Sequence, residues 1–283
     1  MSEFFDSILS LSVVVQILAV VAILVLGFLT FKFFPLKLEI RSITFTALMV
    51  MLSVILSIFS LMVPMFGYPS LKIGFSQLPL MMIGLFLGPS WAFLAGLMED
   101  VLELLTMPVG FPFFGFTLNK ILVAMLPALW MLIPKTKIKQ FKYLPHMLLG
   151  GFYLLAMAFT FTIDEVKVGQ EIMEITMVTK IGIFILSTIL FAFMIVMLNI
   201  ITNYFKTKNL RFALTDWVIA VLLVEFVVNL LLTPLWLQTM YGIPFWFSVA
   251  PRLVKGTVMI QLNIVLGYFI VSTIERLIER RRN

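Results

Sequence analysis

Four basic residues of this sequence stand within or beside apolar stretches, where a charge needs a partner. Lys72 lies in the segment Pro64–Phe75, and Lys120 lies near the start of an apolar run. Arg252 and Lys255 lie three residues apart, so on a helix they share one face. Ammonium and guanidinium groups in such places bind carboxylates of a ligand in a wet cavity. The alternative is that they reach out to lipid headgroups or pair with acidic residues of the chain.

Aromatic residues accompany these cations. Phe113 lies in the Gly- and Pro-containing segment Met107–Phe116, and Trp236 and Tyr241 begin the connection 236–251. Flat aromatic faces beside cations are typical of a pocket for a planar, anionic small molecule. An aromatic belt at the membrane interface is the alternative.

Three acidic residues, Glu99, Asp100 and Glu103, fall together in an apolar run. Glu99 and Glu103 are four apart and share a helical face, whereas Asp100 points away from Glu99. A carboxylate pair could serve proton coupling or acid–base catalysis. It could equally pair with Lys120 or Arg252 as structural polar contacts, and we favour that interpretation.

The composition indicates that most of this chain is surrounded by lipid. Of its 283 residues, 62% are hydrophobic and 12% are charged, so we predict an integral membrane protein and exclude a water-soluble globule. The absence of cysteine and the single histidine, His146, exclude disulfides and metal sites built from Cys or several His, and we expect no cofactor. Most of the net charge of +6 flanks apolar spans, which indicates membrane orientation and no nucleic-acid partner.

Nine apolar runs are candidates for membrane crossings, because a crossing helix needs roughly 20 apolar residues. The third run is short and ends at Gly88-Pro89, so we expect a tight turn or a partial span there. The first run follows acidic residues and is expected to be a retained helix. The runs lie at about 10–31, 42–63, 75–87, 90–107, 116–133, 144–163, 177–202, 212–237 and 249–274.

Lysines and arginines in short loops predict the orientation. Four basic groups fall on one side of the nine-span arrangement and hold 14 of the 20 lysines and arginines. The other side carries acidic residues near the N-terminus and between 164 and 174. We therefore predict an outside N-terminus and a cytoplasmic C-terminus. The basic groups lie at 32–41, 135–142, 206–211 and 276–282.

Enzyme motifs are absent from the sequence. It contains no Gly-rich phosphate loop with a Lys-Ser/Thr ending, no His-Glu-x-x-His and no Gly-x-Ser-x-Gly. We therefore expect no enzyme activity from this chain alone. Transport against a gradient would draw its energy from another subunit or from an ion.

Four short stretches resemble the substrate-binding (S) components of energy-coupling factor (ECF) vitamin transporters, most closely the folate-type branch. Their order and spacing match that branch, although Thr233 stands where it usually has Asn. The stretches are Gly88-Pro89-Ser90-Trp91 followed by Asp100, Phe114–Leu118, Thr233–Leu237 followed by Tyr241-Gly242, and Arg252-Leu253-Val254-Lys255.

The resemblance implies an all-α integral membrane protein with a six-helix S-component-like core and about three additional transmembrane helices. The core would comprise residues 41–133 and 212–283. Residues 1–40 would add an N-terminal helix, and residues 134–211 an inserted helical hairpin. Small residues of the first core helix would dock on the coupling subunit, and Ala47, Ser53, Ser57 and Ser60 are the candidates.

The resemblance further implies a high-affinity capture subunit in a bacterial plasma membrane. It would bind folate or a related anionic vitamin from outside, under a lid formed by Pro64–Phe75. Its partners would be a transmembrane coupling protein and two cassette ATPases, which hydrolyse the ATP. Lys72, Lys120, Arg252 and Lys255 would pair with ligand carboxylates, and Phe113, Trp236 and Tyr241 would contact the ring system.

Three other functions are also consistent with the sequence. An ion-coupled secondary transporter of a small organic anion would use Glu99, Asp100 and Glu103. An intramembrane enzyme acting on a lipid or polyprenyl substrate would use the same carboxylates. An S-type scaffold adapted to another partner would use its three added helices.

Overall fold

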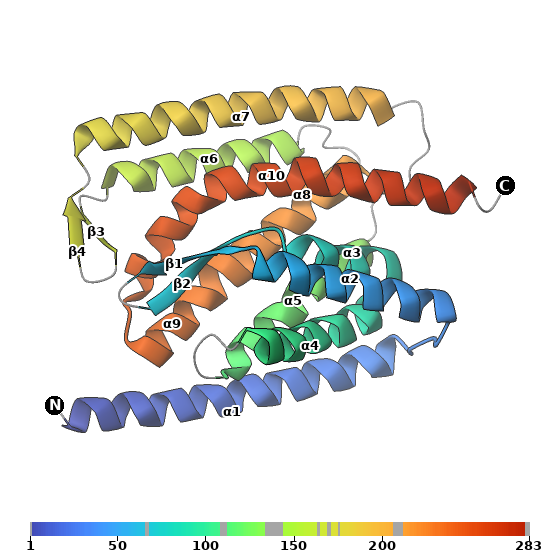
Figure 1. The fold of residues 1–283 in the computed structure, drawn as a ribbon, viewed down its shortest axis with the longest axis horizontal. Coiled ribbons are helices and arrows are strands. Elements are labelled where there is room, and N and C mark those ends of the chain that lie inside the picture. The colour runs from blue at the N-terminus through green and yellow to red at the C-terminus, as the bar shows by residue number, and fades with distance from the viewer. Residues whose placement is uncertain are drawn as a thin grey trace.

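The structure, a computed structural model, describes residues 2–65, 68–107, 112–133, 144–162, 165–168, 171–174, 176–205 and 212–280. Each of the nine apolar runs carries a helix, and the helices run alongside one another as a bundle (Figure 1). The helices are α1 (Ser2–Phe33), α2 (Ile40–Ile58), α3 (Gln77–Leu87), α4 (Pro89–Thr106), α5 (Phe114–Met131), α6 (Leu144–Thr162), α7 (Met177–Phe205), α8 (Leu214–Leu223), α9 (Thr233–Tyr241) and α10 (Phe245–Arg280). A π-helical segment, Val224–Leu232, joins α8 to α9 without a break.

Six stretches of helix are long and apolar enough to cross a membrane within the described part of the chain, which makes this a multi-pass membrane protein. They lie in α1, α2, α5, α7, α10 and the continuous run from α8 through α9. α3 has only 11 residues, about half of the length that a crossing needs, as its short apolar run predicted. Gly88, with φ +87°, ends α3, and Pro89 begins α4 directly after it.

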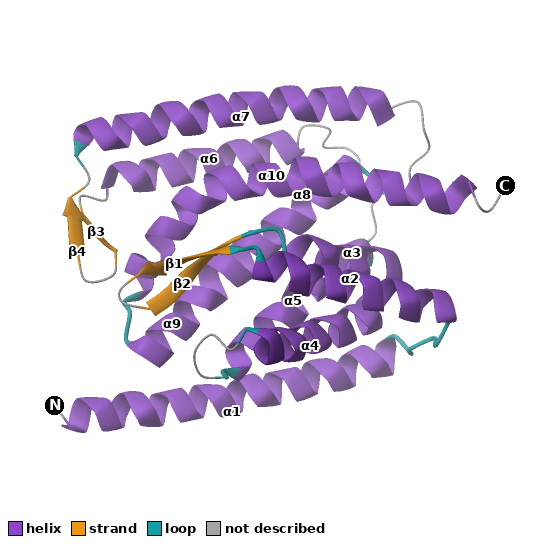
Figure 2. Ribbon diagram, viewed as in Figure 1, coloured by secondary structure: helices purple, strands orange, loops and turns teal. Residues whose placement is uncertain are grey.

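Two short antiparallel hairpins complete the fold, and Figure 2 shows both in the half of the bundle where α1 begins. β1 (Leu61–Met65) pairs with β2 (Tyr68–Ile73), and β3 (Glu165–Val168) pairs with β4 (Glu171–Glu174). The predicted helical run 42–63 is therefore wrong at its end, because the helix stops at Ile58 and the chain becomes a strand at Leu61. Pro64 favours the strand, since the residue before a proline, here Val63, disfavours the α conformation.

The buried core lies where α3, α4 and α5 pack together. Eight consecutive residues of α3, Leu78–Leu85, are buried, and α5 crosses both α3 and α4 closely. In contrast, α1 and α7 leave most of their apolar side chains exposed, as expected for helices in contact with lipid.

The helices outside the expected core lie on two different flanks of the bundle. α1 packs along α4, α5 and α9, whereas α6 and α7 pack along α10 (Figure 1). The division into a six-helix core and added helices stays a prediction, and so does the orientation of the termini.

Candidate functional site

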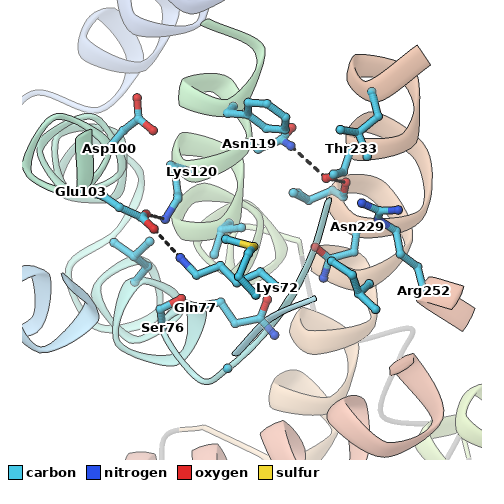
Figure 3. Close-up of a pocket in the computed structure, with 18 of the residues that line it drawn as sticks. Lys72, Ser76, Gln77, Asp100, Glu103, Asn119, Lys120, Asn229, Thr233 and Arg252 are labelled. Carbon is cyan, nitrogen blue, oxygen red and sulfur yellow. Dashed lines mark hydrogen bonds and ion pairs between the residues drawn. The ribbon is translucent and has the colours of Figure 1, made fainter. Parts of the chain in front are cut away.

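A cavity of about 280 Å³ lies between the β1–β2 hairpin and the helices beneath it (Figure 3). Its volume is close to the lower end of the range for small-molecule sites. Within the described residues, no side chain of α1, α6 or α7 lines it. The polar lining consists of Lys72, Ser76, Gln77, Asp100, Glu103, Asn119, Lys120, Asn229, Thr233, Arg252 and Lys255.

Glu103 and two lysines form an ion-pair network on the α4–α5 wall. One oxygen of Glu103 accepts a hydrogen bond from Lys72, and the other accepts one from Lys120 (Figure 3). Lys120 also donates to Glu99, with 2.8 Å between Nζ and Oε1. The interpretation of these carboxylates as partners of Lys120 is therefore confirmed, whereas pairing with Arg252 is not among the described ion pairs.

Two serines of α2 form hydrogen bonds to the carboxylates of this network. Ser57 donates to Glu103, and the single hydroxyl proton of Ser53 has two acceptors within reach, Glu99 Oε1 at 3.0 Å and the Ser76 carbonyl oxygen at 2.6 Å. Both serines are buried, so they do not lie on an outer face of α2. Their expected role in docking a coupling subunit is therefore wrong. Ala47 is exposed and Ser60 is partly exposed.

Lys72 reaches the network from the hairpin, and its environment changes its acidity. Burial is the largest influence and lowers the pKa of the Lys72 ammonium group. The nearby charge of Lys120 lowers this pKa further. Glu103 acts in the opposite direction through its charge and its hydrogen bond. The ion pair between Lys72 and Glu103 thus connects β2 to α4.

The opposite wall carries Arg252 and Lys255, which lie on one face of α10. Lys255 donates to the backbone carbonyl of Lys72, with 3.0 Å between Nζ and O. No carboxylate oxygen of the described residues lies within 4.0 Å of Lys255 Nζ. Arg252 is 3% exposed and donates to the carbonyl and hydroxyl oxygens of Ser248, each at 2.6 Å.

The aromatic residues take different positions around the cavity. Phe113 lines it, and its ring packs on Phe116 and on Trp236, with centroids 5.7 and 5.8 Å apart. Trp236 stands behind Phe113, outside the lining, and its indole donates to Asn119 Oδ1 at 2.9 Å. Asn119 in turn donates to Thr233 at 3.0 Å. Tyr241 ends α9 and does not line the cavity.

Five of the seven predicted site residues therefore line one cavity: Lys72, Phe113, Lys120, Arg252 and Lys255. Whether the seven bind a ligand stays a prediction. Asn119, Asn229 and Thr233 also line the cavity but were not among the predicted site residues, although polar side chains within apolar runs could have indicated them. Nothing in the sequence marked Ser76 or Gln77, because their position depends on how the hairpin folds over α3.

Replacing Trp236 with Phe tests the role of its indole. The change keeps an aromatic ring against Phe113 but leaves Asn119 Oδ1, which is buried, without its donor. We expect the free energy of unfolding to fall by about 1–3 kcal/mol, seen as a lower melting temperature in detergent. Ligand affinity should change less than threefold, because the indole stands outside the lining. A large loss of affinity at unchanged stability would instead show that Trp236 contacts the ligand.

The chain matches none of the known protein-family models, and it matches no curated protein. The crystal structure of FolT bound with folic acid is similar to this chain, with 21% sequence identity and a TM-score of 0.48. The similarity covers 83% of this chain and 97% of that one. A likeness of this size assigns neither a family nor a ligand to this chain.

Proposed function

We propose that this chain captures a small anionic ligand of the folate type in the cavity beneath the β1–β2 hairpin. The observation that carries the proposal is Lys255, a cation on the cavity wall whose hydrogen-bond partner is a neutral carbonyl. A partly buried ammonium with no carboxylate in direct contact is costly, and although the charge of buried Glu225 offsets part of that cost, an anionic ligand would lower it further. Lys72 and Lys120 already have carboxylate partners. We therefore place the carboxylate of the ligand at Lys255.

The lining of the cavity supports a ligand with a flat ring. Phe113 and Phe116 line it together with amide and hydroxyl groups from Asn119, Asn229 and Thr233. Such a combination suits a heteroaromatic ring, whose faces are apolar and whose edge carries hydrogen-bonding atoms. A carboxylate attached to that ring would reach Lys255.

The transport role rests on the four sequence stretches that resemble folate-type S components. All four supply cavity residues, since Asp100, Phe116 and Thr233 belong to the first three and both Arg252 and Lys255 to the fourth. We therefore propose that the chain takes its ligand from outside and works with an ECF coupling protein and two cassette ATPases. The chain itself would perform no chemistry on the ligand.

Equilibrium binding with the purified chain tests this proposal. The chain in detergent is titrated with a panel of vitamins led by folates, without ATP and without other subunits. We expect one-to-one, submicromolar binding of at least one folate-type acid. Folded protein that binds no member of the panel would contradict the proposal and favour an ion-coupled transporter or an enzyme.

A further inference from the structure

The carboxylate of Glu103 lies between two ammonium groups on the wall of the cavity. Lys72, from the hairpin, approaches one oxygen, and Lys120, from α5, approaches the other (Figure 3). The side chain of Glu103 is 19% exposed, and it lines the cavity. Two cations held on either side of one carboxylate form an anion-binding position, which any carboxylate of suitable placement could fill.

Glu99 differs from Glu103 although both pair with Lys120. Glu99 is 0% exposed, does not line the cavity, and also accepts a hydrogen bond from Ser53. Its oxygens lie 2.7 and 2.8 Å from Lys120 Nζ. Glu99 is thus a fixed counter-ion within the protein, whereas Glu103 occupies space that faces the ligand.

Lys72 connects this anion position with the one at Lys255. Its ammonium binds Glu103, and its backbone carbonyl accepts the hydrogen bond from Lys255. The two positions are therefore separated by about the length of one lysine residue. A ligand with two carboxylates at this separation could bind at both positions only if the Glu103 carboxylate left the position between Lys72 and Lys120.

We propose that Glu103 is a specificity-determining residue that fills the second anion position of the cavity. It limits the ligand to a single carboxylate, which binds at Lys255, and it disfavours a second carboxylate through direct competition and charge repulsion. This inference rests on the proposed function and names the class of ligand: a flat heteroaromatic ring joined to one carboxylate. Pteroic acid has that chemistry, whereas folic acid carries a second carboxylate.

Binding of pteroic and folic acid to wild type and to Glu103→Gln tests the inference. Wild type should bind pteroic acid more tightly than folic acid. Glu103→Gln removes the internal anion and keeps the shape of the side chain, so the affinity for folic acid relative to pteroic acid should rise at least tenfold. Glu99→Gln is the matched control, because it removes the same charge from Lys120 outside the cavity, and it should shift that ratio less than threefold.

The outcomes separate the inference from the function on which it rests. Failure of wild type to bind either acid would contradict the proposed function. Tighter binding of folic acid than of pteroic acid by wild type would overturn the inference alone, even if Glu103→Gln failed to fold. An unchanged ratio in folded Glu103→Gln, or an equal change in Glu99→Gln, would overturn it as well.

Discussion

Replacing Lys255 with Gln should weaken binding of a carboxylate ligand by roughly 30- to 150-fold. A hydrogen bond between charged groups contributes about 2–3 kcal/mol more than its neutral replacement in a site shielded from water. Glutamine still carries a donor for the Lys72 carbonyl, so the substitution removes the charge and retains a hydrogen-bonding group. Arg252→Gln should weaken binding in the same direction, because Arg252 lines the same wall.

The measurement is equilibrium binding of the acid and of its carboxamide by each variant. Lys37→Gln is the matched control, since Lys37 is exposed in the connection between α1 and α2 and does not line the cavity. Wild type should prefer the acid, and Lys255→Gln should lose that preference. Unchanged affinity in folded Lys255→Gln would show that the ligand carboxylate lies elsewhere. An equal loss for acid and carboxamide would indicate a purely structural role.

Replacing Gly84 with Ala should disrupt folding more than any change at the cavity. A Cβ atom at this position would lie 1.9 Å from the carbonyl oxygen of Ala124 in α5, and backbone cannot move aside as a side chain can. α3 and α5 approach this closely because glycine has no side chain, as is common between membrane helices. We expect a loss of about 3 kcal/mol or more in the free energy of unfolding.

Thermal unfolding in detergent, followed together with the monodisperse fraction, measures this effect. A loss of this size should lower the melting temperature by roughly 10 °C or prevent recovery of folded protein. Gly150→Ala and Gly182→Ala are the controls, since a Cβ at either position meets nothing within 4 Å. Both should leave stability unchanged or slightly higher, because alanine favours helix. A Gly84→Ala protein as stable as wild type would mean that α3 and α5 do not cross this closely.

The helices could be predicted from the sequence because membrane spans are read directly from the length of apolar runs. The β1–β2 hairpin was the exception. Leu61 and Val63 are as apolar as the helix before them, so composition placed them in the span. Pro64 and Pro69 were the available sign of a strand, since each restricts the backbone before it to extended conformations.

The candidate site was predictable in its residue types and less so in its pairings. Apolar surroundings indicated both Lys120 and Lys255 as candidate site residues. Only the packing of α4 on α5 shows that Lys120 is the one paired with Glu99 and Glu103. The direction in which Trp236 points depends in the same way on Asn119 in α5, which is 117 residues away in the chain. Such contacts depend on helix rotation, which the apolar pattern of a single run does not specify.

Capture of a carboxylate by the cavity can be tested in one comparison. Purified wild-type chain is titrated calorimetrically with a folate-type acid and, in the same buffer, with the matching carboxamide. We predict one-to-one binding of the acid and binding of the carboxamide that is at least tenfold weaker, since Lys255 then lacks its anion. Equal affinity for both compounds, or binding of neither by folded protein, would mean that the cavity does not capture a carboxylate.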